Sequence, residues 1–230
     1  MAQGRYCNII STLRSMGSSS VARTGIAGRG NRRTHLHRLT ASQRNSMDPI
    51  RYPIGHFQPQ KNLSGEQLCN LIHQIPELII KLKALLNGRK DYTLITPYRM
   101  NGWTIKQIIH HIADNDMNAY LRFKRGLTEE NPLATTYRED LWAELNDYKG
   151  LPIENSLALI ELLHHRFFYL LIGLDQNDFK RTIQTEVLGT ITLGIVVQRF
   201  IWHNKRRNSR TYPTPSDVVD TGMLSEIHTV

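Results

Sequence analysis

The sequence predicts an all-α protein built mainly from four long helices. Three stretches, 64–86, 103–127 and 154–174, repeat apolar residues at the spacing of one helix face. A fourth stretch with this spacing begins near residue 192. A residue that can cap a helix stands before the first, the second and the fourth of these stretches. The periodicity and the caps together favour helices over strands.

The first predicted helix begins at Ser64 and ends near Leu86. Ser64 and Gln67 have the spacing of a capping box, in which each side chain binds the backbone N–H of the other residue. Pro76 lies inside the stretch and predicts a kink, because proline cannot donate the helical hydrogen bond. The Asn-Gly pair after Leu86 ends the helix.

The second predicted helix carries the side chains with the clearest chemistry. Thr104 and Gln107 form a second potential capping box directly after a Gly-Trp pair. His110, His111 and Asp114 follow on the same helix, beside its isoleucine stripe. Such a helix can hold a metal ion between the helices of a bundle. It can equally be a surface helix with two solvated histidines, and spacing alone leaves both interpretations open.

The rest of the chain adds shorter elements and another histidine pair. We expect a short helix over 138–147, and a small hairpin or extended loop over 180–191, where Gly189 interrupts an alternating run. His164 and His165 lie in the middle of the third long helix, about 100° apart around its axis. At most one of them therefore points into the interior, and we expect His164 to have a structural role.

Composition limits the class of protein. A chain of 230 residues fits one domain with some length left over. Its 40% hydrophobic and 21% charged residues are typical of a soluble globular protein. No apolar run approaches the roughly 20 residues that cross a bilayer. The two cysteines, Cys7 and Cys69, do not suggest a secreted protein held together by disulfide bonds. We therefore expect a cytoplasmic protein in a reducing compartment.

The net charge of +9 lies outside the central part of the chain. Residues 1–46 hold eight arginines and no acidic residue, and residues 204–230 add a net +1. Residues 47–203 therefore have no net charge and no electrostatic footprint for nucleic acid. The leader, 1–46, is typical of a disordered segment or of a mitochondrial transit peptide. We favour a third interpretation, in which Met47 is the true start.

Five segments of the chain resemble one protein family. They are RYPIGHF (51–57), TPYRMNGWTIKQIIHHIADNDMNAYLRFKRGLTEENP (96–132), YREDLWAEL (137–145), FKRTI (179–183) and GTITLGIVVQRFIWH (189–203). Across 47–203 they resemble the DinB/YfiT-like family of metal-dependent hydrolases, some of which are described as bacillithiol transferases. The resemblance implies an up-down four-helix bundle with a short extra helix and a small extended segment. It also implies a cytoplasmic homodimer that contacts neither nucleic acid nor membrane.

The resemblance further implies a metal centre. In the family, three histidines hold one divalent ion, zinc or nickel, in each subunit. By the interval from the Trp, the first ligand here is His111 rather than His110, and the first histidine of the family's HxxxH is His203. An open coordination position would lower the pKa of a bound water or bind a thiol. Asp114 is the candidate catalytic residue, either as the group that orients His111 or as a base. The implied substrate is a small thiol or an electrophile.

The chain departs from the family at the third ligand. Residues four apart lie on one helix face, so the partner of His203 is position 207, which holds Arg207. Arginine is not a metal ligand and its charge repels a dication. The sequence beyond it has two prolines and no helical period. A frameshift, a truncated gene or a sequencing error near Asn204 would produce such an ending.

These observations divide the chain into three parts and leave two functions open. The parts are a leader over 1–46, a bundle over 47–207 and an irregular tail over 208–230. The first function is a metal-dependent thiol transferase or hydrolase. The alternative is a catalytically silent bundle that lacks the third ligand and only dimerises or binds a partner.

Overall fold

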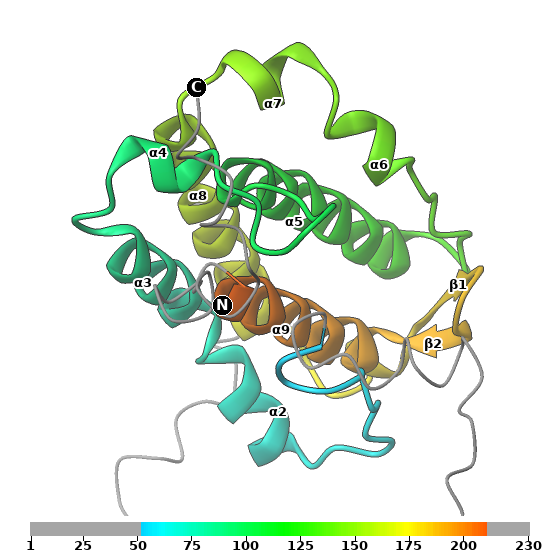
Figure 1. The fold of residues 1–230 in the computed structure, drawn as a ribbon. Coiled ribbons are helices and arrows are strands. Elements are labelled where there is room, and N and C mark those ends of the chain that lie inside the picture. The colour runs from blue at the N-terminus through cyan, green and yellow to red at the C-terminus, as the bar shows by residue number, and fades with distance from the viewer. Residues whose placement is uncertain (1–51, 211–230) are drawn as a thin grey trace, which may run out of the picture.

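The computed structural model describes residues 52–210, and Figure 1 shows their arrangement. The leader predicted over 1–46 and residues 211–230 of the predicted tail lie outside the described residues. The elements in chain order are α2 (Gly65–Ile72), α3 (Ile75–Leu86), α4 (Asp91–Leu94), α5 (Ile105–Thr128), α6 (Glu139–Trp142), α7 (Asn146–Gly150), α8 (Ile153–Ile172), η1 (Asp178–Lys180), β1 (Thr182–Thr185), β2 (Gly189–Thr192) and α9 (Leu193–Arg210).

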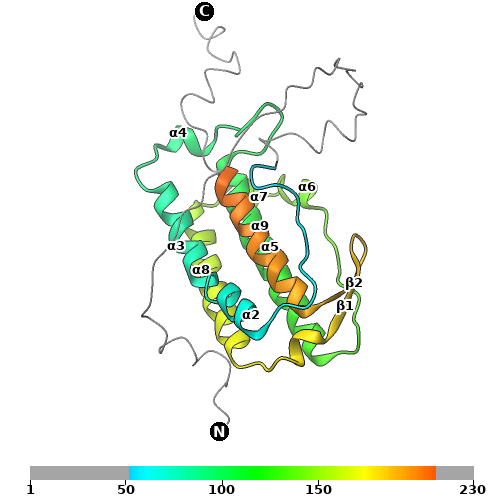
Figure 2. The same cartoon turned by 90° about the horizontal axis from the view of Figure 1, so that it is seen from below.

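Four of these helices, α3, α5, α8 and α9, form a bundle, as the sequence predicted. Each is in close contact with two others: α8 packs against α3 and α5, and α9 packs against the same two. The helices α3 and α5, which are consecutive members of the bundle, therefore lie diagonally across it. The long connection over residues 87–104, which contains α4, makes this crossing possible. Figure 2 shows α4 near one end of α9 and the hairpin at the other.

The first predicted helix is two helices rather than one kinked helix. The predicted capping box of Ser64 and Gln67 is present at the start of α2. The helix stops at Ile72, and α3 begins at Ile75. Pro76 stands in the first turn of α3, where a missing N–H costs no helical hydrogen bond. The proline therefore marks a helix start and not a bend within a continuous helix.

The two longest helices have the extents that their apolar stripes indicated. The capping box of Thr104 and Gln107 opens α5, and α8 spans the third predicted stretch. The short helix expected over 138–147 is instead the pair α6 and α7, separated by a turn. In Figure 1 this pair forms an arch beside α5.

The predicted hairpin is present and leads directly into α9. Strand β1 pairs antiparallel with β2, with Ile183 opposite Ile191. The start of α9, directly after the hairpin, packs closely against α5. A Cβ built on Gly126 of α5 would lie 2.6 Å from a Leu193 methyl carbon. Helix α9 continues to Arg210, so residues 208–210, assigned from sequence to the irregular tail, are helical. Position 207 therefore lies within a helix.

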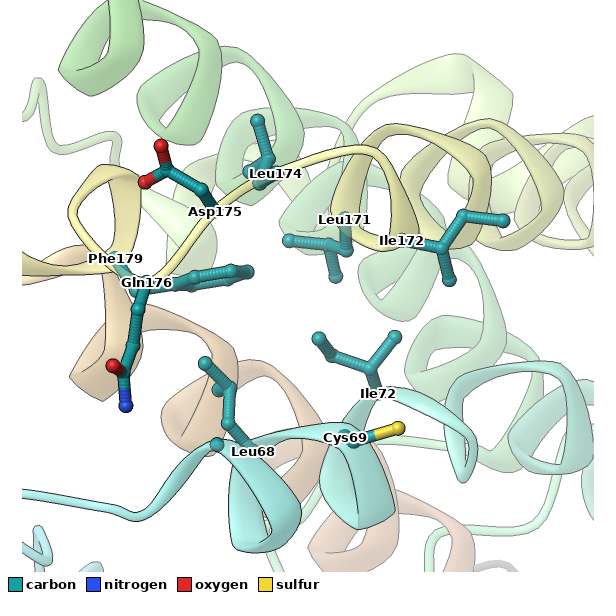
Figure 3. Close-up of a pocket in the computed structure, with 10 residues that line it drawn as sticks. Leu68, Cys69, Ile72, Leu171, Ile172, Leu174, Asp175, Gln176 and Phe179 are labelled. Carbon is teal, nitrogen blue, oxygen red and sulfur yellow. The ribbon is translucent and has the colours of Figure 1, made fainter. Parts of the chain in front are cut away.

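The core has an aromatic half and an isoleucine half. Phe123, Phe167 and Phe200 pack edge to face, with ring centroids 5.0 to 5.1 Å apart, at the hairpin end. Isoleucines of α5 fill the other end together with α3 and α8. Between α2 and the end of α8 the packing leaves a cavity of about 30 Å³, shown in Figure 3. That space is roughly the size of one water molecule, so it is a packing gap rather than a ligand site.

No helix within residues 52–210 is long and apolar enough to cross a membrane.

Candidate active site

The site forms where α5 and α9 meet, around two histidines. His111 of α5 and His203 of α9 are the two ligands that the resemblance implied, and the structure brings them together. Their Nε2 atoms lie 3.3 Å apart, and the ring centroids are 5.3 Å apart. His111 is 1% exposed. The two imidazoles therefore point at one another from facing helices, with His111 buried and His203 partly exposed.

Arg207 lies against this pair. It is one helical turn beyond His203, and its Nε donates a hydrogen bond to Nε2 of His203 at 3.3 Å. Its guanidinium carbon lies 5.1 Å from the centroid of the Trp103 ring, a cation–π distance. Trp103 in turn packs on His111, with ring centroids 4.8 Å apart. With only 5% of its surface exposed, Arg207 is part of the site and not a solvated residue beside it.

Glu139, the first residue of α6, is a member of the site that sequence reasoning missed. Its Oε2 lies 3.6 Å from Nε2 of His111 and 3.7 Å from a terminal nitrogen of Arg207. The Glu139 side chain is 54% exposed, so it forms the open side of the site. The residue belongs to the segment YREDLWAEL, which already carried the family resemblance, and that was the available signal.

The surroundings keep His203 neutral. Burial lowers the pKa of His203 well below its usual 6.5, and the charge of Arg207 and the neighbouring His111 lower it further. A neutral imidazole has one ring nitrogen with a free lone pair. That lone pair can accept the N–H of Arg207 or bind a metal ion, and the two uses compete.

Asp114, the candidate catalytic residue, is paired with a tyrosine. The hydroxyl of Tyr148, on α7, donates a hydrogen bond to Oδ2 of Asp114 at 2.6 Å. Burial raises the pKa of Asp114, although the Tyr148 hydrogen bond acts in the opposite direction. In the structure the partner of Asp114 is therefore Tyr148, and a role in orienting His111 stays a prediction.

The other histidines of the helices are engaged elsewhere. His110 lies 2.8 Å from the hydroxyl of Ser156 on α8, through its Nδ1. His164 is fully buried, with its Nε2 2.8 Å from a carboxylate oxygen of Asp116. The second oxygen of Asp116 accepts a hydrogen bond from Asn204 at 2.9 Å. His164 thus joins a polar network that ties α5, α8 and α9 together, as its expected structural role requires.

The two histidines fit a metal ion, whereas the third position does not. Two nitrogens bound to one tetrahedral zinc at about 2.0–2.1 Å are about 3.3–3.4 Å apart, which matches the separation of the two Nε2 atoms. Within residues 52–210, no group of three His, Cys, Asp or Glu side chains is arranged to hold an ion. Arg207 occupies the position at which the sequence resemblance implies a third histidine. Glu139 places a carboxylate oxygen 3.6 Å from Nε2 of His111.

A cleft of about 450 Å³ opens beside the pair. Its walls come from α5, α9, the hairpin, Glu139 and residues 52–57, and His203 and Arg207 line it. A volume in this range is typical of pockets for small molecules. The cleft therefore gives a small substrate direct access to His203, whereas His111 does not line it.

Comparison with known proteins identifies the family. Residues 80–208 match the profile of the DinB superfamily. A protein of Bacillus cereus named "Putative metal-dependent hydrolase" is 37% identical over 163 residues, which are 71% of this chain and 94% of that protein. A protein of the same name from Geobacillus thermodenitrificans is 42% identical over 166 residues, covering 72% of this chain and 93% of that protein.

A solved structure has the same fold. YfiT from Bacillus subtilis, described as "a probable metal-dependent hydrolase with an unusual four-helix bundle topology", matches with a TM-score of 0.70 and 36% identity. The match covers 76% of this chain and 98% of YfiT. With the diagonal bundle, the paired histidines and these relatives in agreement, the chain belongs to the DinB superfamily.

Proposed function

We propose that the cleft is the active site of a metal-dependent hydrolase or thiol transferase, in which His111 and His203 hold zinc or nickel. The observation that carries the proposal is the 3.3 Å separation of the two Nε2 atoms. The names of the Bacillus and Geobacillus relatives support the metal and the hydrolytic chemistry. Thiol transfer rests on the sequence resemblance alone.

A bound divalent ion would supply Lewis-acid activation of a water or a thiol. The protein's own residues do the rest. The low pKa of His203 keeps its lone pair available as a ligand at neutral pH. Glu139 places a carboxylate at the open side of the pair, where it can take up a proton from a substrate in the cleft. Trp103 covers the His111 ring and limits the access of water from that side.

Arg207 should make the ion bind weakly. Its charge opposes a dication, and its N–H occupies the lone pair of His203. Because α9 extends to Arg210, a histidine at position 207 would stand on the same helix face as His203. We therefore expect Arg207→His to raise zinc affinity, and His203→Ala to abolish whatever binding the native chain has.

Calorimetric titration with zinc and with nickel at pH 7.5 tests this expectation. Arg166→His, an exposed change on α8, is the matched control and should leave the affinity as it is in the native chain. Because the pKa of His203 is lowered well below 6.5, protonation of His203 should weaken binding only at a pH well below 6.5, since a protonated imidazole cannot ligate. Tight binding that survives His203→Ala would place the ion elsewhere and refute the proposal.

The contact between Arg207 and His203 favours a second candidate, a catalytically silent bundle. In that case the guanidinium takes the place of the ion and the pair serves only to join α5 and α9. Negligible zinc and nickel binding by both the native chain and Arg207→His would select this candidate. A dimerisation or binding role would then be examined by measuring the mass of the protein in solution.

A further inference from the structure

The cleft contains two arginines that form no ion pair with a carboxylate of residues 52–210. Arg122 of α5 and Arg199 of α9 both line it. The ion pairs within residues 52–210 involve other arginines and lysines and neither of these two. Burial lowers the pKa of Arg122, Tyr137 acts in the opposite direction, and the positive charge of Arg199 lowers the pKa again.

Arg122 is held by one hydrogen bond and has an N–H group without a partner among the described residues. One of its terminal nitrogens donates a hydrogen bond to the backbone carbonyl of Thr135. Its Nε is buried, and among the described residues it has no hydrogen-bond partner. A guanidinium has five N–H donors in a rigid fork, which matches the two oxygens of a carboxylate or phosphate. A fixed, half-buried arginine with an unused donor is suited to such an anion.

The remaining charges of the cleft do not cancel this pair. The lining includes four arginines, at 122, 199, 206 and 207, and two glutamates. Glu139 lies within ion-pair distance of Arg207. Glu186, on the β1–β2 turn, lies 3.4 Å from the hydroxyl of Thr136. Four arginines against two glutamates leave the lining of the cleft with a net charge of +2.

The arginine pair lies close to the histidines. Arg199 precedes His203 by one turn of α9, which is a rise of about 6 Å. Asn115 and Ala119 of α5 line the cleft between the levels of His111 and Arg122. A small molecule anchored at the arginines would therefore extend its other end toward the imidazoles.

We propose that the cleft recognises a small molecule by an oxyanion group, a carboxylate or a phosphate, bound between Arg122 and Arg199. This inference deepens the proposed function, because it names the substrate class of the same site. It rests on the proposed function only in treating the bound molecule as a substrate. Anion binding itself requires neither metal nor turnover, so the two proposals can fail separately.

Calorimetric titration of the full chain with succinate and with inorganic phosphate, in the presence of a chelator, tests the inference. Removing one charge-assisted contact costs enough to weaken binding at least about tenfold. We therefore expect Arg122→Gln and Arg199→Gln each to produce such a loss. The matched control is Arg166→Gln, which removes the same charge from an exposed position on α8. Thermal melting of each variant verifies that it is folded.

Each outcome has a clear meaning. Tighter succinate than phosphate binding identifies a carboxylate substrate, and the reverse identifies a phosphate. An equal loss in Arg166→Gln would show a mere effect of net charge and would overturn the inference. Unchanged binding in the Arg122→Gln, Arg199→Gln double variant, or no binding of either anion by the native chain, would also overturn it. Anion binding that persists in His203→Ala supports it whatever the fate of the metal proposal.

Discussion

Asp114 is a carboxylate whose ionisation the fold opposes. Because its pKa is raised in the folded state, the native protein holds its proton more tightly than the unfolded chain does. The charged form therefore reduces stability above the unfolded pKa, near 3.9, and this penalty disappears as the pH falls below it. We expect Asp114→Asn to raise the melting temperature at pH 7 and to have little effect near pH 3.

Asp140 is the control for this prediction, because its pKa is shifted in the opposite direction. Arg138 lowers the pKa of Asp140 to about 2, so Asp140→Asn should not raise stability at pH 7. If Asp114 is catalytic, Asp114→Asn will also lose activity while it gains stability. A melting temperature that drops at pH 7 would show that Asp114 contributes more through its Tyr148 hydrogen bond than it costs through burial.

The adjacent histidines of α8 should differ sharply in their effect on stability. His164 is buried against Asp116, whereas His165 is exposed. Removing His164 leaves a buried oxygen of Asp116 without its hydrogen-bond partner, so His164→Ala should cost about 1–3 kcal/mol. A surface change such as His165→Ala should stay within about 0.5 kcal/mol. Urea denaturation of both variants measures the difference, and similar values would show that Asp116 finds another partner.

At the scale of residues, spacing alone left the role of the α5 histidines open. The family resemblance selected His111 and His203, which the structure brings together, but it did not point to Glu139. Glu139 comes from a short helix without a period, so nothing in its own neighbourhood pointed toward His111. The orientation of Asp114 depended on where α7 would pack, which a single helix pattern does not contain.

At the level of elements, α5 and the start of α9 approach one another closely at Gly126. A Cβ on Gly126 would lie 2.6 Å from a Leu193 carbon and 2.8 Å from an Ile183 carbon. Gly126→Ala should therefore force the hairpin away from α5 and cost about 1–3 kcal/mol. Gly150→Ala is the control, because a Cβ there meets no atom within 4 Å. Equal melting temperatures for the two variants would show that the Leu193 side chain rotates out of the way.

Helix ends were easier to predict than helix breaks. Both capping boxes are local, depend on two residues three apart, and are present in the structure. The break before Pro76 was predicted as a kink, because a proline is compatible both with a bend and with a new first turn. Only the packing of α2 against α8 and α9 decides between them.

For the whole molecule, the concentration of positive charge in residues 1–46 predicts that the bundle folds independently of them. Deletion of 1–46 removes eight arginines and no residue of the bundle. We expect the shortened protein to keep its helical circular dichroism and its cooperative melting. Its isoelectric point should fall, because the remaining chain has a net charge of only +1. Loss of cooperative melting would show that the leader supports the fold.

The diagonal placement of α3 and α5 determines the order in which the protein can be completed during synthesis. These two helices emerge early from the ribosome, yet α8 and α9 supply the close packing on either side of them. The His111–His203 contact joins positions far apart in sequence, and such non-local contacts slow folding. A nascent chain without α9 therefore exposes an apolar groove and half of the candidate site, so correct assembly depends on α9, which is made after the other three helices of the bundle.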